Sequence, residues 1–201
     1  MSVETDGEVV GRSLGEPAAF AVLYDRHARL VYRYAALRVG VAAAEDVSSE
    51  TFLVAFEGRA QFDAERGDVR AWLLGIATVL LRKRARLEAR AWKGMFAEHV
   101  AQVLELDPLD AVAARLDASA AVRRLGRALR RLPAGERDVL LLHAWGDLDY
   151  QGIADALDVP IGTVRSRLNR ARTKLRRVLD AGTTRRVEVE HGQPDAAAQS
   201  Q

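Results

Sequence analysis

The chain of 201 residues contains no cysteine, five prolines and few aromatic residues, which make up 6% of the sequence. Without cysteine it can form no disulfide, no thiolate nucleophile and no cysteine-ligated metal site. No apolar run approaches the roughly 18 residues of a membrane-spanning helix, and the acidic N-terminal stretch lacks the apolar core of a signal peptide. We therefore expect a cytoplasmic protein that is not inserted in a membrane.

Recognisable catalytic motifs are also missing. The four histidines lie far apart in the sequence and form no HExxH pair, and the chain has no glycine-rich phosphate loop and no GxSxG elbow. These histidines are His27, His99, His143 and His191. We expect no enzymatic activity, no bound metal and no cofactor; the competing possibility is a hydrolase or transferase that depends on one of these histidines.

The sequence lacks the period-two alternation of half-buried strands and has no Asn-Gly hairpin signal. Apolar residues recur instead at steps of three and four, the spacing of helices that bury one face. The predicted helices cover about 17–39, 42–56, 69–90, 135–145, 150–157 and 161–179, with a further helix ending at "RRLP". The fold class is therefore all-α.

Two small helical domains are expected, because the apolar content of 49% is sufficient for a core in each. They cover 16–93 and 117–180. Residues 94–116 are mildly acidic, contain Pro108 and show weak periodicity, so we predict a flexible linker there. The ends, 1–15 and 181–201, are rich in small and polar residues and are predicted to be a flexible lead and a flexible tail.

Positive charge is concentrated in two segments, although the whole chain carries a formal net charge of only +2. One is the "RKRAR" stretch that follows the apolar half of the helix predicted at 69–90; the other is 161–179, "IGTVRSRLNRARTKLRRVL". Local basic patches attract polyanions through counterion release. A solvated helix face explains the same pattern without a polyanion.

Residues 150–172, "YQGIADALDVPIGTVRSRLNRAR", have the spacing of a helix-turn-helix motif. Asp158 falls where the turn needs a left-handed residue, and Pro160 suits the entry to the second helix, where no backbone donor is needed. In such a motif the N-terminal half of the second helix enters the DNA major groove. A helical hairpin with a soluble basic face is the alternative.

The side chains that point away from the apolar stripe of the second helix are suited to DNA. Arginine can form two hydrogen bonds with a guanine edge and asparagine with an adenine edge, whereas hydroxyls and further arginines hold phosphates. The candidate DNA-binding residues are Thr163, Arg165, Ser166, Arg167, Asn169 and Arg170.

Two stretches resemble a known protein family, and they occur in that family's order. Residues 132–176, "LPAGERDVLLLHAWGDLDYQGIADALDVPIGTVRSRLNRARTKLR", closely resemble region four of RNA polymerase sigma factors of the extracytoplasmic-function (ECF) group in the sigma-70 family. Residues 23–56, "LYDRHARLVYRYAALRVGVAAAEDVSSETFLVAF", and 62–86, "FDAERGDVRAWLLGIATVLLRKRAR", resemble region two of these factors.

This resemblance implies a sigma factor, which binds core RNA polymerase, directs promoter recognition and melting, and performs no chemistry itself. Region two would bind the polymerase clamp and the minus-ten element, and region four the minus-thirty-five element as duplex. The alternative is a helix-turn-helix transcriptional regulator that acts without being a polymerase subunit. Family members are often inhibited by a dedicated anti-sigma factor, so we expect such a partner as well.

The resemblance also assigns a polymerase contact to the acidic second helix. The corresponding residues are Glu45, Asp46, Ser49, Glu50 and Phe52. An amphipathic acidic helix can dock on a basic coiled coil. Acidic residues in a first turn also stabilise the N-terminus of a helix through its dipole, so capping alone explains them equally well.

The loop at 57–68 corresponds to the family's specificity loop, where a minus-ten base is flipped into a pocket. Stacking and cationic contacts must offset the cost of extracting that base. The minus-ten candidates are Phe62, Arg66, Arg70, Trp72, Arg82, Lys83, Arg84 and Arg86. Trp72 is the weakest of these candidates, because an aromatic residue followed by "LLGIA" is more often part of a core. A helix end whose cations match the dipole is the alternative for the basic residues of the arm.

The sequence departs from the family pattern at three places. Val79 stands where the family usually has asparagine, which puts minus-ten contacts of that helix in doubt. Ser49 replaces a common glutamine in the clamp helix, which would loosen polymerase docking. Gln151 and Gly152 replace a pair of glutamates before the helix-turn-helix.

Overall fold

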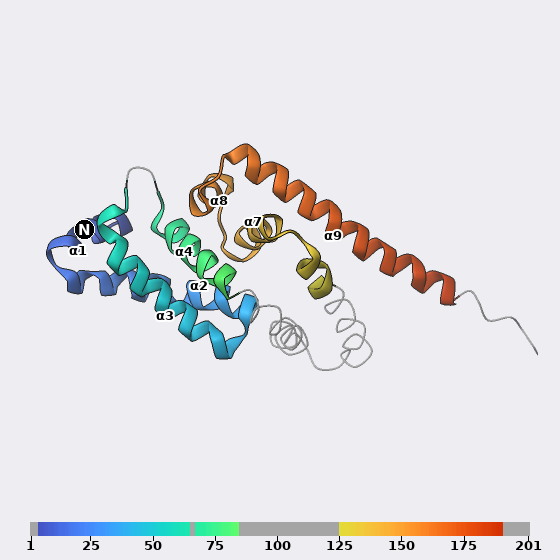
Figure 1. Cartoon of the computed structure of the whole chain (residues 1–201), viewed down its shortest axis with the longest axis horizontal. Coiled ribbons are helices and arrows are strands. Elements are labelled where there is room, and N and C mark those ends of the chain that lie inside the picture. The colour runs from blue at the N-terminus through green and yellow to red at the C-terminus, as the bar shows by residue number, and fades with distance from the viewer. Residues whose placement is uncertain (1–3, 65–66, 85–124, 191–201) are drawn as a thin grey trace, which may run out of the picture.

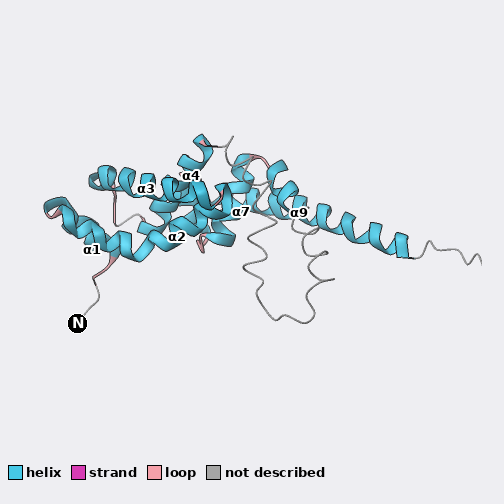
Figure 2. Ribbon diagram, turned by 90° about the horizontal axis from the view of Figure 1, so that it is seen from below, coloured by secondary structure: helices cyan, strands magenta, loops and turns pink. Residues whose placement is uncertain are grey.

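The structure is a computed structural model that describes residues 4–64, 67–84 and 125–190, with side chains described up to residue 178. Every secondary-structure element in these ranges is a helix (Figures 1 and 2), as the all-α prediction requires. None of the described helices is both long and apolar enough to cross a membrane. The predicted linker at 94–116 lies outside the described residues.

The helices of the first unit begin and end close to the predicted positions, except that the helix predicted to reach about residue 90 ends at Lys83; residues 85–90 lie outside the described residues. Its elements are η1 (Pro17–Phe20), α2 (Ala21–Val39), α3 (Val41–Gly58), η2 (Arg59–Gln61) and α4 (Val69–Lys83). Gly40 separates α2 from α3 with a φ of 91°, a conformation that strains any residue with a Cβ. Asp68 begins α4 by accepting a hydrogen bond from the Arg70 amide. The buried side chains of α2, α3 and α4 form one apolar core.

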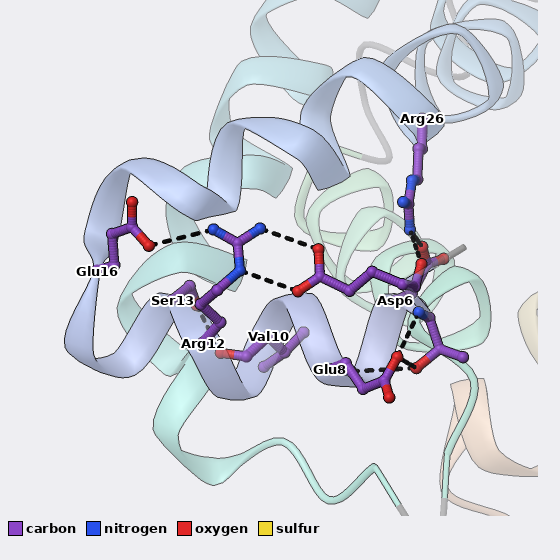
Figure 3. A network of polar contacts seen from close by, with 9 residues as sticks. Asp6, Glu8, Val10, Arg12, Ser13, Glu16 and Arg26 are labelled. Carbon is purple, nitrogen blue, oxygen red and sulfur yellow. Dashed lines mark hydrogen bonds and ion pairs between the residues drawn. The ribbon is translucent and has the colours of Figure 1, made fainter. Parts of the chain in front are cut away.

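An additional helix, α1 (Asp6–Gly15), packs on this unit, so the prediction of a flexible lead at 1–15 is wrong for these residues. Thr5 and Glu8 form a reciprocal capping box at its start. Further along the helix, Arg12 pairs with Glu16 (Figure 3). Val9 and Val10 are buried in the core. The helix forms because its few apolar residues lie together on one face, which the polar composition of the segment conceals.

The second unit contains the helix-turn-helix. Residues 125–131 are helical and precede α7 (Ala134–Trp145), α8 (Tyr150–Leu157) and α9 (Ile161–Glu190). The predicted flexible tail at 181–201 therefore begins too early, since α9 continues to residue 190; 191–201 lie outside the described residues. Both views show α9 extending away from the other helices (Figures 1 and 2).

The two units contact each other through α4 and α8, which lie side by side in Figure 1. A buried ion pair between Arg38 of α2 and Asp138 of α7 also joins them. Sequence spacing could not predict this ion pair, because its two residues lie 100 positions apart in the chain.

Candidate nucleic-acid interface

The turn between α8 and α9 has the geometry predicted for a helix-turn-helix. Asp158 is left-handed, with φ and ψ of 50° and 56°, as its position in the sequence indicated. At the other end of α8, the Asp149 carboxylate accepts a hydrogen bond from the Gly152 amide at 2.7 Å. The short helix is thus fixed at both ends, which sets the angle at which α9 leaves the turn.

The apolar stripe of α9 fixes the rotation of that helix. Val164, Leu168 and Ala171 are buried with at most 1% of their surface exposed, and they pack on the core formed with α7 and α8. Because these residues recur at steps of three and four, the residues between them face away from the core. The predicted stripe, which also includes Ile161, Leu175 and Val178, is confirmed at these three positions; Ile161 and Leu175 are half-buried, and Val178 is exposed.

Arg165, Ser166 and Asn169 form the exposed face of the first turns of α9, which we call the recognition face. Ser166 donates a hydrogen bond to the Thr163 carbonyl at 3.0 Å, leaving its oxygen lone pairs available. The side chains of Arg165 and Asn169 make no hydrogen bond or ion pair within the part of the chain whose side chains the structure describes. Their donors are therefore available to a ligand.

The other two predicted arginines are held by α7. Arg170 donates to Glu136 at 3.2 Å, and Lys174 donates to the second oxygen of the same carboxylate at 2.7 Å. Glu136 is almost completely buried, whereas the Arg170 side chain remains 55% exposed. The Arg167 guanidinium lies against the start of α7, where a Cβ at Gly135 would approach it to 3.2 Å. These contacts orient both arginines before any ligand binds.

The acidic helix α3 presents three of the five predicted polymerase residues to solvent. Glu45, Asp46 and Ser49 are exposed, and Glu50 is half-buried. Phe52 is not on this surface: only 6% of it is exposed, and its ring packs edge-to-face on Tyr24 at 4.8 Å. Its prediction as a contact residue is corrected, because the core already uses this ring.

Leu53, which was not among the predicted contact residues, is 56% exposed on the same helix. It follows Asp46 by seven residues, which at helical pitch places the two on one face. This spacing was available in the sequence. A large exposed apolar side chain beside a row of acidic residues has the character of a contact surface.

Arg84, at the end of α4, is paired with the acidic helix. Its guanidinium lies 3.6 Å from the Asp46 carboxylate and 2.9 Å from that of Glu50. The predicted phosphate contact at Arg84 thus competes with an ion pair inside the unit. Asp46 remains 71% exposed, so its carboxylate is still accessible from solvent.

Two of the minus-ten candidates pack on each other. Phe62 and Trp72 are half-buried, and their rings lie 4.8 Å apart at a tilt of 35°. Trp72 also lines a shallow groove of about 320 Å³ together with Val79 and Lys83 of α4 and Asp155 of α8. Each ring therefore packs on the other and still leaves part of its surface exposed to solvent.

The remaining basic candidates differ in their surroundings. Arg70 lies 3.9 Å from Asp68 and 3.6 Å from Asp147, and Lys83 is exposed. Arg82 donates to Asp138 of α7 at 2.7 Å. Arg66 and Arg86 lie outside the described residues.

Two family models match the chain, in the order of its two helical units. The model described as Sigma-70 region 2 matches residues 23–91, and the model described as Sigma-70, region 4 matches residues 122–175.

Curated relatives extend the likeness over most of the chain. The chain is 34% identical over 179 residues to the ECF RNA polymerase sigma factor BldN of Streptomyces coelicolor, covering 86% of this chain and 65% of the relative. It is 33% identical to the ECF RNA polymerase sigma factor SigL of Mycobacterium tuberculosis, covering 88% of this chain and 98% of the relative. Among solved structures, CnrH in complex with the cytosolic domain of CnrY aligns with a TM-score of 0.58 at 26% identity, over 88% of this chain and 97% of that one.

Proposed function

Because the chain belongs to the ECF group of the sigma-70 family, we propose that the recognition face of α9 binds the minus-thirty-five element of its promoters. Membership makes the protein a non-catalytic subunit that binds core RNA polymerase and promoter DNA to initiate transcription. The observation that carries the residue assignment is the exposure of Arg165, Ser166 and Asn169 on a helix whose buried stripe fixes its rotation.

Arg165 and Asn169 of this face contact DNA bases, and the neighbouring side chains at the start of α9 contact the phosphates of the DNA backbone. Arg165 and Asn169 have free donors that fit guanine and adenine edges in the major groove. Arg170 is tethered by Glu136, which restricts its guanidinium to one direction and suits it to a phosphate. Thr163, Ser166 and Arg167 supply further phosphate contacts at the start of the helix.

The exposed face of α3 binds the polymerase clamp. Glu45, Asp46 and Ser49 present polar and negative groups, and Leu53 adds an apolar contact on the same face. Charge attraction speeds the encounter and sets its orientation, whereas burial of the leucine contributes affinity.

The edge formed by the Phe62–Trp72 pair, Arg70 and Lys83 binds the melted minus-ten strand. Single-stranded bases stack on aromatic rings while cations follow the backbone. Arg82 and Arg84 join this edge once they are released from Asp138 and from the acids of α3. The functional units then correspond to 16–93 for region two and 117–180 for region four.

An anti-sigma factor is the expected regulator, and a cytoplasmic location follows from the need to meet the polymerase. The aligned structure of CnrH contains the cytosolic domain of CnrY, which supports a protein partner of this class. A regulator that works without polymerase is not favoured, since a region-two match occupies 23–91 where such a protein would carry a sensor or dimerisation domain.

Run-off transcription with purified core polymerase and a panel of genomic promoter fragments tests the proposal. We expect transcripts only when both the protein and core polymerase are present, and weak promoter binding by the protein alone. Arg165→Ala should reduce transcripts while polymerase binding is retained. Tight operator binding without polymerase would instead support an independent regulator, and equal transcription by Arg165→Ala would remove the assignment of the recognition face.

A further inference from the structure

The helix α1 packs against the loop that the resemblance to sigma factors assigns to minus-ten recognition. It precedes residues 23–91, which match the region 2 model. In its last turn, the Ser13 carbonyl accepts a hydrogen bond from the Arg59 Nε at 3.3 Å. In its first turn, a Cβ added at Gly7 would lie only 2.9 Å from the Ala64 Cβ. We call these two pairs the α1–loop contact.

The position of α1 is itself fixed by the rest of the first unit. Val9 and Val10 are buried in the apolar core. The Asp6 carboxylate accepts a hydrogen bond from Arg26 of α2 at 2.6 Å (Figure 3), and its other oxygen lies 2.5 Å from the His27 Nε2. Because α1 is held at several points, the loop residues that contact it are restricted in position as well.

Arg59 joins the carboxyl ends of two helices. Besides its bond to the Ser13 carbonyl in the last turn of α1, its guanidinium donates to the Phe56 carbonyl in the last turn of α3. The same group lies over the Phe56 ring, 3.8 Å from the ring centroid. The last carbonyls of a helix have no partner within it, and the dipole makes that end negative. One cation therefore satisfies two helix ends and fixes the start of the loop between them.

The segment held in this way contains one member of the aromatic pair at the minus-ten edge. The Phe62 amide donates to the Arg59 carbonyl at 3.3 Å, so a single turn joins the two residues. The Phe62 ring lies 4.8 Å from the Trp72 ring. Arg59 and Ala64 lie on either side of Phe62 in the chain, so a movement of either one moves this ring.

We propose that α1 is a positioning element for promoter recognition: the α1–loop contact holds Phe62 where it meets the melted minus-ten strand. Gly7 and Arg59 are positioning residues, because they act through the loop. The proposal rests on the proposed function, since it takes the edge around Phe62 and Trp72 as the minus-ten site. It adds residues 6–15 to the unit of region two, which was predicted at 16–93.

The physical reason is the conformational entropy of the loop. A segment that is disordered in the free protein must lose this entropy when DNA binds, and the loss opposes binding. A segment that the fold already orders has no such cost. A base is also discriminated only when the groups that contact it are held within a fraction of an ångström. The α1–loop contact should therefore affect the choice of base more than the binding of polymerase.

Substitution of Arg59 tests the positioning role in the complex with core polymerase. Arg59→Ala removes the side-chain hydrogen bonds to both helix ends. The assay measures binding of the complex to single-stranded minus-ten DNA from a promoter identified by run-off transcription, in the original sequence and with each base changed in turn. We expect the preference at one position to fall about tenfold, the scale of discrimination at a single base, while the affinity for core polymerase is unchanged. Arg33→Ala, which removes an exposed arginine of α2, is the charge-matched control.

A disulfide can replace the lost contact, since the chain contains no cysteine of its own. The Cβ atoms of Gly7→Cys and Ala64→Cys would start 2.9 Å apart, and a shift of about 1 Å brings them to the ~3.8 Å of a disulfide. In the Arg59→Ala chain, the oxidised cysteine pair should restore the preference, and reduction should remove it again. Gly11→Cys with Ala64→Cys should leave the preference low in either redox state, because a Cβ at Gly11 has no neighbour within 4 Å.

Rescue by the disulfide separates positioning from a direct DNA contact, because it returns the loop to α1 without returning the arginine. A loss of preference that the oxidised pair does not restore would make Arg59 a DNA contact and overturn the proposal. An unchanged preference in Arg59→Ala, a loss of polymerase binding in that chain, or failure of the disulfide to form would overturn it too. Failure of the proposed function is distinguishable, since then the unmodified chain shows no preference at any position of the strand.

Discussion

The amide of Val159 donates a hydrogen bond to the carbonyl of Ala154 across 3.0 Å, and this bond closes the turn between the two helices of the helix-turn-helix. The Asp158 amide donates to the Asp155 carbonyl at 3.3 Å beside it. The pair of bonds is a Schellman motif, which requires a left-handed residue at position 158. The direction of the recognition helix thus depends on the conformation of one aspartate.

The stability of region four is expected to rise or fall according to the residue that replaces this aspartate. Asp158→Gly should raise the free energy of unfolding by about 0.5–1 kcal/mol, because glycine adopts the left-handed conformation without a Cβ clash. Asp158→Val should lower it by about 1–2 kcal/mol. Urea unfolding monitored by circular dichroism provides the comparison, and equal stability of the two variants would contradict this account of the turn.

Substitutions of two neighbouring residues of α3 are expected to affect different properties: one should weaken polymerase binding, and the other should lower the stability of the fold. Leu53→Ala should leave the free energy of unfolding within about 0.5 kcal/mol and weaken binding to core polymerase at least about fivefold, because the side chain is exposed. Phe52→Ala should lower the free energy of unfolding by about 3–5 kcal/mol, because the ring is buried against Tyr24. Thermal unfolding and polymerase titration separate the two effects. Normal polymerase binding by Leu53→Ala would remove this leucine from the interface.

Local patterns were sufficient to predict most of the helices. The helix at 150–157 was predicted with the boundaries observed, since the turn residues after Leu157 mark its end. The buried stripe of α9 followed from spacing alone. In contrast, α1 was missed: its capping residues Thr5 and Glu8 were present in the sequence, but its docking depends on Val9 and Val10 meeting a surface far along the chain.

The candidate site was harder to predict wherever a long-range partner determines the role of a side chain. Periodicity can place Phe52 and Leu53 on α3, but only the packing of Tyr24 shows which of them is buried. Likewise Arg82 and Arg84 belong to one basic stretch, yet one binds Asp138 and the other the acids of α3. Sequence spacing contains no information on such pairs, because each partner lies on another helix.

Docking of α1 is expected to weaken in acid. Burial raises the pKa of Asp6, but hydrogen bonds from Arg26 and His27 outweigh this effect and hold its pKa below the ordinary value of 3.8. A carboxyl group with a lowered pKa stabilises the folded state above its ordinary pKa, and this stability is lost as the pH falls through the folded value. In the unmodified chain, proteolysis of the N-terminal segment should therefore increase as the pH falls from 5 to 3. Asp6→Asn should already show increased proteolysis of this segment at pH 7, and it should lack the further increase between pH 5 and pH 3. Asp25→Asn, at an exposed position of α2, is the control that should behave as the unmodified chain.

The assignment of Arg165 and Arg170 to bases and phosphates predicts different responses to salt and sequence. Arg165→Ala should weaken promoter binding by the polymerase complex by about 1–3 kcal/mol and relax discrimination at one position of the minus-thirty-five element, because a free guanidinium can bond two acceptors of one base. Arg170→Ala should weaken binding to all sequences alike and reduce the slope of log affinity against log salt by about 1, because the side chain held by Glu136 is directed to the backbone. Arg33→Ala, an exposed arginine of α2, is the charge-matched control. Fluorescence anisotropy with wild-type and singly substituted promoter duplexes at several salt concentrations measures both the sequence discrimination and the salt slope. Identical sequence and salt dependence for the two variants would refute the division of roles.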